Sequence, residues 1–361
     1  MFSVRPLATV AMASALALAT SAPAGAIVKH PDPARTGRYS QVNLVSDVPG
    51  LASLTDPDLV NAWGLSQGPT TPLWASDNGT DLSTLYDLRV PGTKVQRLIV
   101  SIEGGAPTGT VFNSTGSPTA FTVSASGTTG PARFIFAGEN GDITAWNGAG
   151  TTAVHVAGHA GAIYKGLALV ADPTSPRLLA ANFHDNRIDV FDAAFMPVPA
   201  HHAFRSIGIP HGYAPFNVVV LRGKVYVSYA KQDAARHDDV AGAGHGFINV
   251  YSTHGRFLEH LVRRGVLDSP WGMAIAPMGF GSLGGKLLVG NFGNGHIHAF
   301  DPRTGRLVST LRGSNGKPIT IDGLWGLLPG NGASAASTDV WFSAGPDGEA
   351  HGLLGLLKLA P

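Results

Sequence analysis

Apolar and polar residues alternate along this chain in short runs, and glycine, asparagine or aspartate separates one run from the next. Gly141–Asn147 is a clear example, because polar and apolar residues alternate there up to a closing Trp-Asn pair. Alternation over about four to eight residues predicts a β-strand with one buried face, and the separating residues predict tight turns. After residue 26 no stretch shows the sustained apolar period of about 3.6 residues that is typical of a helix. The pattern therefore predicts an all-β protein.

The same run returns at intervals of roughly 50 residues, which indicates a repeat architecture. Its copies are Leu82–Asp87, Gly141–Asn147, Asn186–Asp192, Gly246–Ser252, Gly295–Asp301 and Gly352–Lys358. A second phrase, in three of its six copies an aromatic residue followed by glycine and an apolar residue, recurs at residues 61–65, 119–123, 163–167, 214–218, 269–273 and 323–327. A further apolar run lies between the two phrases, so each unit holds three or four short strands. Six units of a four-stranded antiparallel meander predict a six-bladed β-propeller.

The two ends of the repeat region predict how the ring closes. The last unit supplies only three strands, at residues 324–328, 340–344 and 353–359. An unassigned alternating strand, Gln41–Asp47, precedes the first unit. We expect this N-terminal strand to complete the last blade, because closure removes the unpaired edges of an open sheet. Residues 41–361 are then a single propeller domain.

The N-terminus has the features of a secretory signal peptide at residues 1–26. Arg5 supplies the positive charge, Leu7–Ala22 is apolar, and Ala24–Ala26 has the small-x-small form of a cleavage site. We therefore expect cleavage near Ala26 and a secreted or periplasmic protein without a membrane anchor. Residues 27–40 are expected to be a flexible lead-in.

Composition narrows the classes of partner. The 25 basic residues nearly balance the 24 acidic ones and form no basic run, which argues against nucleic acid as a partner. The chain has no cysteine, so disulfides, zinc–thiolate sites and thiol nucleophiles are excluded. The 47 glycines fit a protein built from tight hairpins. We expect a monomer.

Polar residues gather at the turns that lie on one face of the predicted ring, where the innermost strands begin. A 17-residue insert, Ala230–Gly246, replaces the short turn of the fourth unit. The candidate ligand-binding residues on this face are Asn78, Asn140, Asn182, His184, Asn217 and Asn291. One interpretation is turn chemistry alone, since hairpin turns require asparagine, aspartate and glycine. The other is a Ca²⁺ site, because this ion prefers oxygen ligands; the candidate set is Asn182, Asn217, Asn291 and Asp322.

Two further features leave alternatives open. The aromatic series Trp63, Phe121, Phe216, Trp271 and Trp325 occupies one repeat position and predicts core packing, with a stacking platform for a flat ligand as the alternative. Lys165 breaks this series and faces the channel or covers apolar surface. The insert Ala230–Gly246 is longer than a turn needs, so it is either functional or disordered.

The innermost-strand phrases, above all Ser269-Pro-Trp-Gly-Met273, and the phrase Gly-x-Ile-x-x-Phe-Asp resemble NHL-type six-bladed propellers. The segments Asn61–Gly64 and Ala75–Thr80 make the chain similar to a family of uncharacterised exported bacterial propellers. More distantly it resembles calcium-dependent lactonases of the gluconolactonase type. That resemblance implies a metal held by a glutamate, two asparagines and an aspartate. Asn182, Asn291 and Asp322 match three of these roles, and Asn61 stands where the resemblance implies the glutamate.

The sequence thus predicts an exported propeller that binds a small molecule, a glycan or a protein through the face where the innermost strands begin. The alternative is a Ca²⁺-dependent hydrolase of lactones or esters, in which the metal polarises a carbonyl group. The candidate proton carriers of that hydrolase are His184, His211 and His237. Whether the protein is an enzyme is left open.

Overall fold

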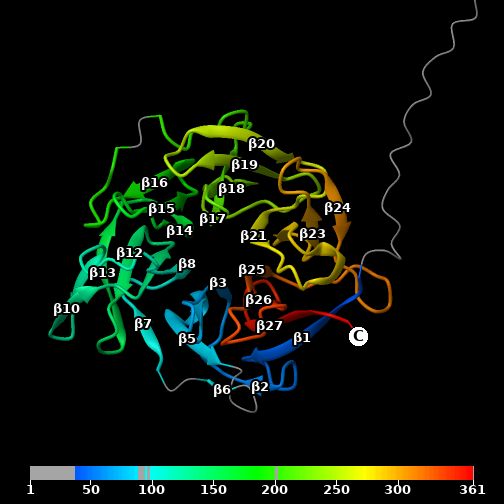
Figure 1. Ribbon diagram of the computed structural model, residues 1–361, viewed down its shortest axis with the longest axis horizontal. Coiled ribbons are helices and arrows are strands. Elements are labelled where there is room, and N and C mark those ends of the chain that lie inside the picture. Colours follow the sequence, from blue (N-terminus) through cyan, green and yellow to red (C-terminus); the bar gives the residue numbers. More distant parts are fainter. Residues whose placement is uncertain (1–36, 88–93, 96–97, 200–201, 361) are drawn as a thin grey trace, which may run out of the picture. The chain divides into compact units, whose positions relative to one another are not determined.

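β-Strands make up almost all of the regular structure in the computed structural model, which describes residues 37–87, 94–95, 98–199 and 202–360. Strands account for 50% of the structure and helices for 2%, and the sheets have a propeller arrangement (Figure 1). This confirms the predicted all-β propeller. The predicted signal peptide and residues 27–36 of the lead-in lie outside the described residues. No helix in the described part is long and apolar enough to span a bilayer.

Six strands of the described part surround the central channel. They are β3 (Ala62–Ser66), β8 (Pro107–Phe112), β14 (Tyr164–Val170), β17 (Tyr213–Leu221), β21 (Pro270–Ile275) and β25 (Leu324–Pro329). Each packs beside the next one in this order, and β25 packs beside β3 (Figure 1). The inner strands therefore form a closed ring.

One residue position explains how the inner strands approach so closely. Five of the six strands have a glycine there and the sixth has an asparagine: Gly64, Gly109, Gly166, Asn217, Gly272 and Gly326. A Cβ on Gly64 would lie 2.3 Å from the carbonyl oxygen of Thr108, and one on Gly109 would lie 2.2 Å from the backbone nitrogen of Leu167. Asn217 instead donates from Nδ2 to the carbonyl oxygen of Trp271 at 2.8 Å. We call these six residues the glycine ring.

The remaining strands extend outward from the ring as antiparallel meanders. After β3 come β4 (Leu73–Asp77), β5 (Leu82–Asp87), β6 (Lys94–Val95) and β7 (Val100–Ile102); after β8 come β11 (Phe134–Gly138), β12 (Asp142–Trp146) and β13 (Thr152–Gly158); after β14 come β15 (Arg177–Asn182) and β16 (Arg187–Phe191). After β17 come β18 (Lys224–Lys231), β19 (Gly246–Ser252) and β20 (Phe257–Arg263); after β21 come β22 (Leu287–Asn291), β23 (Ile297–Phe300) and β24 (Leu307–Thr310); after β25 come β26 (Val340–Ala344) and β27 (Leu353–Leu359).

Strand pairing among the described residues gives four blades rather than the six predicted. Only four sheets contain four or more strands. β7 pairs in parallel with β13, which joins the first and second meanders into one nine-stranded sheet. The meander β14–β16 has only three strands.

The N-terminal strand closes the last sheet, as predicted. β1 (Tyr39–Ser46) pairs antiparallel with β27, and the short strand β2 (Leu54–Thr55) pairs with β1. β1 begins two residues before the predicted strand, so Tyr39 and Ser40 do not belong to a flexible lead-in. The reason is burial: the side chain of Tyr39 is 1% exposed and its hydroxyl donates to the carbonyl oxygen of Phe280 at 3.1 Å.

The prediction for the innermost strand of the second unit, residues 119–123, is wrong. β8 takes that place, because it pairs with β11 and packs between β3 and β14. The predicted segment runs into a separate hairpin of β9 (Thr122–Ala125) and β10 (Thr128–Pro131). The aromatic residue Phe121 marks the repeated phrase, but close strand packing requires a glycine, and Gly109 supplies it.

Candidate functional site

Lys165 is a buried charge at the end of the channel where the inner strands begin, which we call the channel mouth. It immediately precedes a member of the glycine ring, and its side chain is 2% exposed. Its ammonium lies 5.2 Å from the centre of the Trp63 ring, and its carbonyl oxygen accepts from Nε1 of Trp271 at 2.8 Å. Burying a charge is costly unless it is paired, so its partners define the site.

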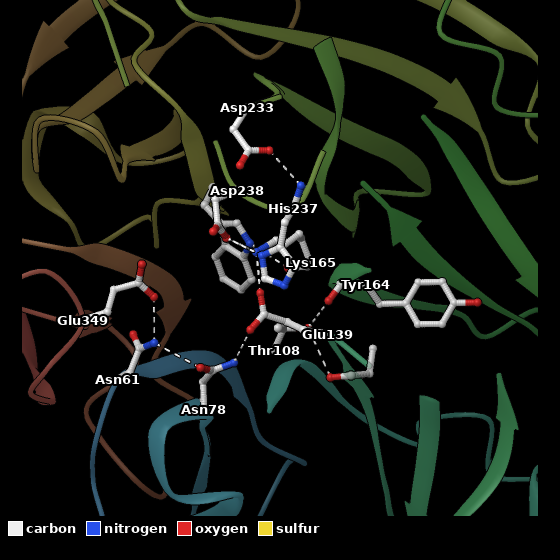
Figure 2. A network of polar contacts seen from close by, with 12 residues as sticks. Asn61, Asn78, Thr108, Glu139, Tyr164, Lys165, Asp233, His237, Asp238 and Glu349 are labelled. Carbon is white, nitrogen blue, oxygen red and sulfur yellow. Dashed lines mark hydrogen bonds and ion pairs between the residues drawn. The ribbon is translucent and has the colours of Figure 1, made fainter. Parts of the chain in front are cut away.

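Two carboxylates from different parts of the chain hold the ammonium (Figure 2). Oε1 of Glu139, in the turn after β11, contacts Nζ of Lys165 directly, and Oδ1 of Asp238 lies 3.0 Å from the same atom. Burial alone would lower the pKa of Lys165, but the two carboxylates outweigh it and hold the pKa above its usual value. The lysine is therefore charged at neutral pH.

A chain of amides extends from this ion pair to the last turn of the protein (Figure 2). Nδ2 of Asn78 donates to Oε2 of Glu139 at 3.0 Å. Nδ2 of Asn61 donates to Oδ1 of Asn78 at 3.2 Å and to Oε2 of Glu349 at 2.7 Å. Nε1 of Trp325 donates to Oδ1 of Asn61 at 3.1 Å, which fixes the orientation of that amide. We call Asn61, Asn78, Glu139, Lys165, His237, Asp238 and Glu349 the mouth network.

The insert between β18 and β19 is ordered and carries part of this network. The backbone nitrogen of Asp233 donates to the carbonyl oxygen of Asp238 at 2.8 Å, and the backbone nitrogen of His237 donates to Oδ1 of Asp233 at 2.9 Å. Nε2 of Gln232 anchors the loop on the carbonyl oxygen of Phe183 at 2.6 Å. The loop thereby holds Asp238 against Lys165, which resolves the alternative of a disordered insert.

The channel mouth carries an excess of negative charge. Glu139, Asp238, Asp239 and Glu349 face a single ammonium. Burial raises the pKa of Asp239 to about 6 and holds the pKa of Glu349 above its usual value. Both oxygens of Glu139 are already bonded. In contrast, no hydrogen bond from a described residue reaches Oδ2 of Asp238 or Oε1 of Glu349, so these atoms are free to accept.

The aromatic residues beside Lys165 are core residues, as predicted. Trp63 stacks on Trp325 with ring centres 3.6 Å apart and meets Trp271 edge-on at 6.0 Å. The three indoles are at most 4% exposed and pack with Phe216. Their faces are therefore covered, which removes the alternative of a stacking platform. Phe121 belongs to a different cluster, in keeping with the corrected position of its segment.

The other predicted asparagines bond to partners outside the mouth network. Nδ2 of Asn140 donates to the carbonyl oxygen of Gly104 at 2.8 Å. Nδ2 of Asn182 donates to Oδ2 of Asp189 at 2.9 Å. Asn217 belongs to the glycine ring. Nδ2 of Asn291 donates to the carbonyl oxygen of Val266 at 2.8 Å. Of the six predicted residues, the mouth network contains Asn78.

The predicted Ca²⁺ set of Asn182, Asn217, Asn291 and Asp322 stays a prediction. Two of its oxygens already accept hydrogen bonds from the backbone. Oδ1 of Asn217 is occupied by the backbone nitrogen of Val218 at 2.8 Å, and Oδ2 of Asp322 accepts from the backbone nitrogen of Asp347 at 2.9 Å.

Glu139, His237 and Asp238 form a second group of candidate metal ligands. Ligand atoms of Glu139, His237 and Asp238 lie within 4.8 Å of one another. However, the ammonium of Lys165 contacts both carboxylates and already supplies the positive charge that a cation would bring.

The three candidate proton carriers lie in two places. His237 belongs to the mouth network, where its Nδ1 lies 2.9 Å from Oδ1 of Asp238. His184 and His211 line a separate cavity of about 210 Å³ beneath the insert, together with Gln232 and Arg236. Nδ1 of His184 lies 3.0 Å from Oδ1 of Asp185.

Sequence reasoning missed Glu349 and treated Glu139 only as a turn residue. Glu349 has a φ of 71° in the turn before β27, and no sequence pattern marks it as a partner of Asn61. Lys165 had a signal, because it interrupts an aromatic series. The interrupted series does not indicate whether the lysine side chain points into the channel or lies along apolar surface.

Comparison with known proteins identifies relatives but no characterised family. A search against protein families finds no match. Uncharacterized protein R648 of Acanthamoeba polyphaga mimivirus is 32% identical over 332 residues, which cover 86% of this chain and 78% of that protein. Uncharacterized protein L690 of the same virus is 33% identical over 330 residues, which cover 87% of this chain and 84% of that protein.

Proposed function

The chain belongs to the family of the uncharacterized mimivirus proteins R648 and L690, and we propose that it binds a small ligand through the mouth network. The observation that carries this proposal is Lys165, a charge with 2% exposure held by carboxylates from two parts of the chain. A buried ion pair contributes little to stability compared with apolar packing. Clusters of buried, interacting charges are concentrated at functional sites.

The free groups of the network define the ligand. The atoms without a partner from a described residue, Oδ2 of Asp238 and Oε1 of Glu349, are acceptors, so the ligand must bring hydrogen-bond donors. The excess of carboxylates favours an ammonium or a neutral polyol over an anion. Because the indole faces are covered, hydrogen bonds rather than stacking would select the ligand. A glycan or protein partner at this face remains a prediction on the same grounds.

Thermal unfolding with a panel of amines, polyols and sugars tests the proposal on the protein that starts at Ile27. A ligand at about 100 times its dissociation constant stabilises the folded state by roughly 2.7 kcal/mol. We expect a hit to raise the melting temperature of the wild type and of Asp322→Asn, a control on the same face. The same ligand should not raise the melting temperature of Glu349→Gln or Asp238→Asn. An equal shift in all four proteins would contradict binding at the mouth network.

Ca²⁺ belongs in the same panel, because the alternative prediction is a Ca²⁺-dependent lactonase or esterase. In that case Ca²⁺ should stabilise the wild type after EDTA treatment, and Asp322→Asn should lose the effect. Asp322→Asn therefore separates the two predictions. It should keep the stabilisation by a ligand of the mouth network and lose the stabilisation by Ca²⁺. A Ca²⁺ effect that depends on Asp322 would justify a screen for lactone and ester hydrolysis.

We also propose that the protein has six blades, as the repeat predicts. The six inner strands and the six members of the glycine ring support this number. On this interpretation the parallel pairing of β7 with β13 joins two blades at their outer edges. Gly64→Ala and Gly326→Ala lie in blades far apart in sequence. A sixfold repeat predicts that the two variants lower the free energy of unfolding equally, which chemical denaturation measures.

Export remains a proposal that rests on residues 1–26 alone. The features that support it are the apolar segment Leu7–Ala22 and the small residues Ala24–Ala26. N-terminal sequencing of the protein recovered from outside the cytoplasm should begin near Ile27, and a start at Met1 would contradict export by this route. Size-exclusion chromatography of the same sample tests the expected monomer.

A further inference from the structure

We propose that the other end of the central channel is a second, independent binding site for a small uncharged apolar molecule. A cavity of about 290 Å³ lies there. It is lined mainly by residues of all six inner strands that belong to the glycine ring or follow it, whereas the mouth network lies where those strands begin. We call this cavity the apolar chamber.

The lining of the apolar chamber differs in chemistry from the channel mouth. None of its lining residues is charged, although the chain has 25 basic and 24 acidic residues. Its wall is formed largely by Leu65, Val111, Leu167, Val219, Met273 and Leu327. A concave, mostly apolar cavity with a few polar groups is the usual form of a small-molecule site.

The aromatic core separates the apolar chamber from the mouth network. Trp271 lines the chamber and meets Trp63 edge-on, and Trp63 stacks on Trp325. Since Trp63 and Trp325 are 1% exposed, water does not reach between these rings. A ligand in the chamber therefore cannot contact Lys165, and the two sites should bind independently.

Two polar side chains of the chamber wall are closed to a ligand. Thr110 lines the chamber and is 6% exposed, but its hydroxyl oxygen is itself buried and has no partner among the described residues, so a ligand in the chamber does not reach it. Asn217, also in the wall, offers nothing further, because its amide already bonds to Trp271 and Val218.

The volume decides the size of the occupant. Small-molecule pockets in proteins have volumes of roughly 300–1,000 Å³, so a chamber of about 290 Å³ lies at the small end of this class. The chamber therefore fits a compact, mostly apolar molecule.

Fluorescence titration with N-phenyl-1-naphthylamine, an uncharged apolar probe with one N–H donor, tests this site. We expect saturable binding to the wild type with one probe per chain. Val219→Asp places a carboxylate in the wall and should weaken binding by about tenfold or more, because a charge facing an apolar ligand loses its water. Val266→Asp is the matched control, since Val266 is 36% exposed and does not line the chamber. It should bind like the wild type.

Two further variants keep the test decisive. Leu328→Trp fills the chamber from a partly buried wall position and should reduce binding even if Val219→Asp does not fold. Asp238→Asn changes only the mouth network and should leave probe binding unchanged. Binding that survives both Val219→Asp and Leu328→Trp, or no saturable binding to the wild type, would overturn the proposal. Neither result depends on whether the mouth network binds a ligand.

Discussion

A charged side chain that leaves water needs partners, and Lys165 has two of different kinds. Glu139 is mostly buried, with a side chain that is 14% exposed, whereas Asp238 is 65% exposed. The buried partner gives the stronger electrostatic interaction because less water screens it. The exposed partner lies on a loop and is the one that a ligand can reach. A single residue that departs from an aromatic series thus creates the charged centre of the channel mouth.

We expect the single substitution Lys165→Met to destabilise the fold. The change leaves Glu139 without its counter-charge, and breaking a buried pair costs about 3–5 kcal/mol. We expect the lower end of that range, since Asp238 is largely exposed and keeps its water. Urea unfolding of the two proteins measures the difference.

The double variant Lys165→Met with Glu139→Gln serves as the control for this prediction. It removes both members of the buried pair and should recover a large part of the lost stability. Glu139→Gln could instead lower the stability of the Lys165→Met protein as much as it lowers the stability of the wild type. In that case the two side chains do not form the coupled pair that their contact indicates.

The inner strands depend on the absence of a side chain at one position. Each glycine of the ring lies against the backbone of the next strand, and for Gly109 the nearest atom to an added Cβ would be the nitrogen of Leu167 at 2.2 Å. Backbone cannot move aside as a flexible side chain can. Asn217 is the exception, and its amide makes a hydrogen bond across the same gap. The distance between neighbouring inner strands therefore decides which residue fits at this position.

Gly109→Ala should accordingly lower the free energy of unfolding by about 3 kcal/mol, the upper part of the usual range for overpacking. Gly130→Ala is the matched control, because Gly130 lies in β10 with no atom within 4 Å of its added Cβ. The control should stay within about 0.5 kcal/mol of the wild type. Equal stability of the two variants in a denaturant titration would show that β8 and β14 do not approach as closely as described.

The described part of the chain from residue 37 onward forms a closed ring of inner strands, and its first and last long strands, β1 and β27, meet in one sheet. β1 covers the edge of β27 with a register that runs from Tyr39 opposite Leu359 to Ser46 opposite Leu353. Without β1, the backbone groups of β27 would form an exposed edge, which favours aggregation. Closure therefore stabilises strands that lie more than 300 residues away from β1 in sequence.

A chain that starts at Asp47, without β1, should melt at a lower temperature and tend to aggregate. A chain that starts at Gly37 is the control and should match the protein that starts at Ile27. Adding a peptide of residues 39–46 to the shortened chain should restore part of the lost stability, because an added strand can pair with the free backbone groups of β27. An unchanged melting temperature after removal of β1 would refute closure by this strand.

The sequence by itself determined most of the strands, the repeat and the closing role of β1. A period-two pattern records which face of a strand is buried, and this information is local. Tertiary structure alone decided the partners of Lys165, the pairing of Asn61 with Glu349 and the joining of two meanders through β7. These contacts depend on the placement of atoms from turns and loops far apart in the chain, to within a few tenths of an ångström. Strand patterns carry no record of such distances, which is why the phrase around Phe121 predicted an innermost strand that β8 supplies instead, and why Glu349 was not predicted.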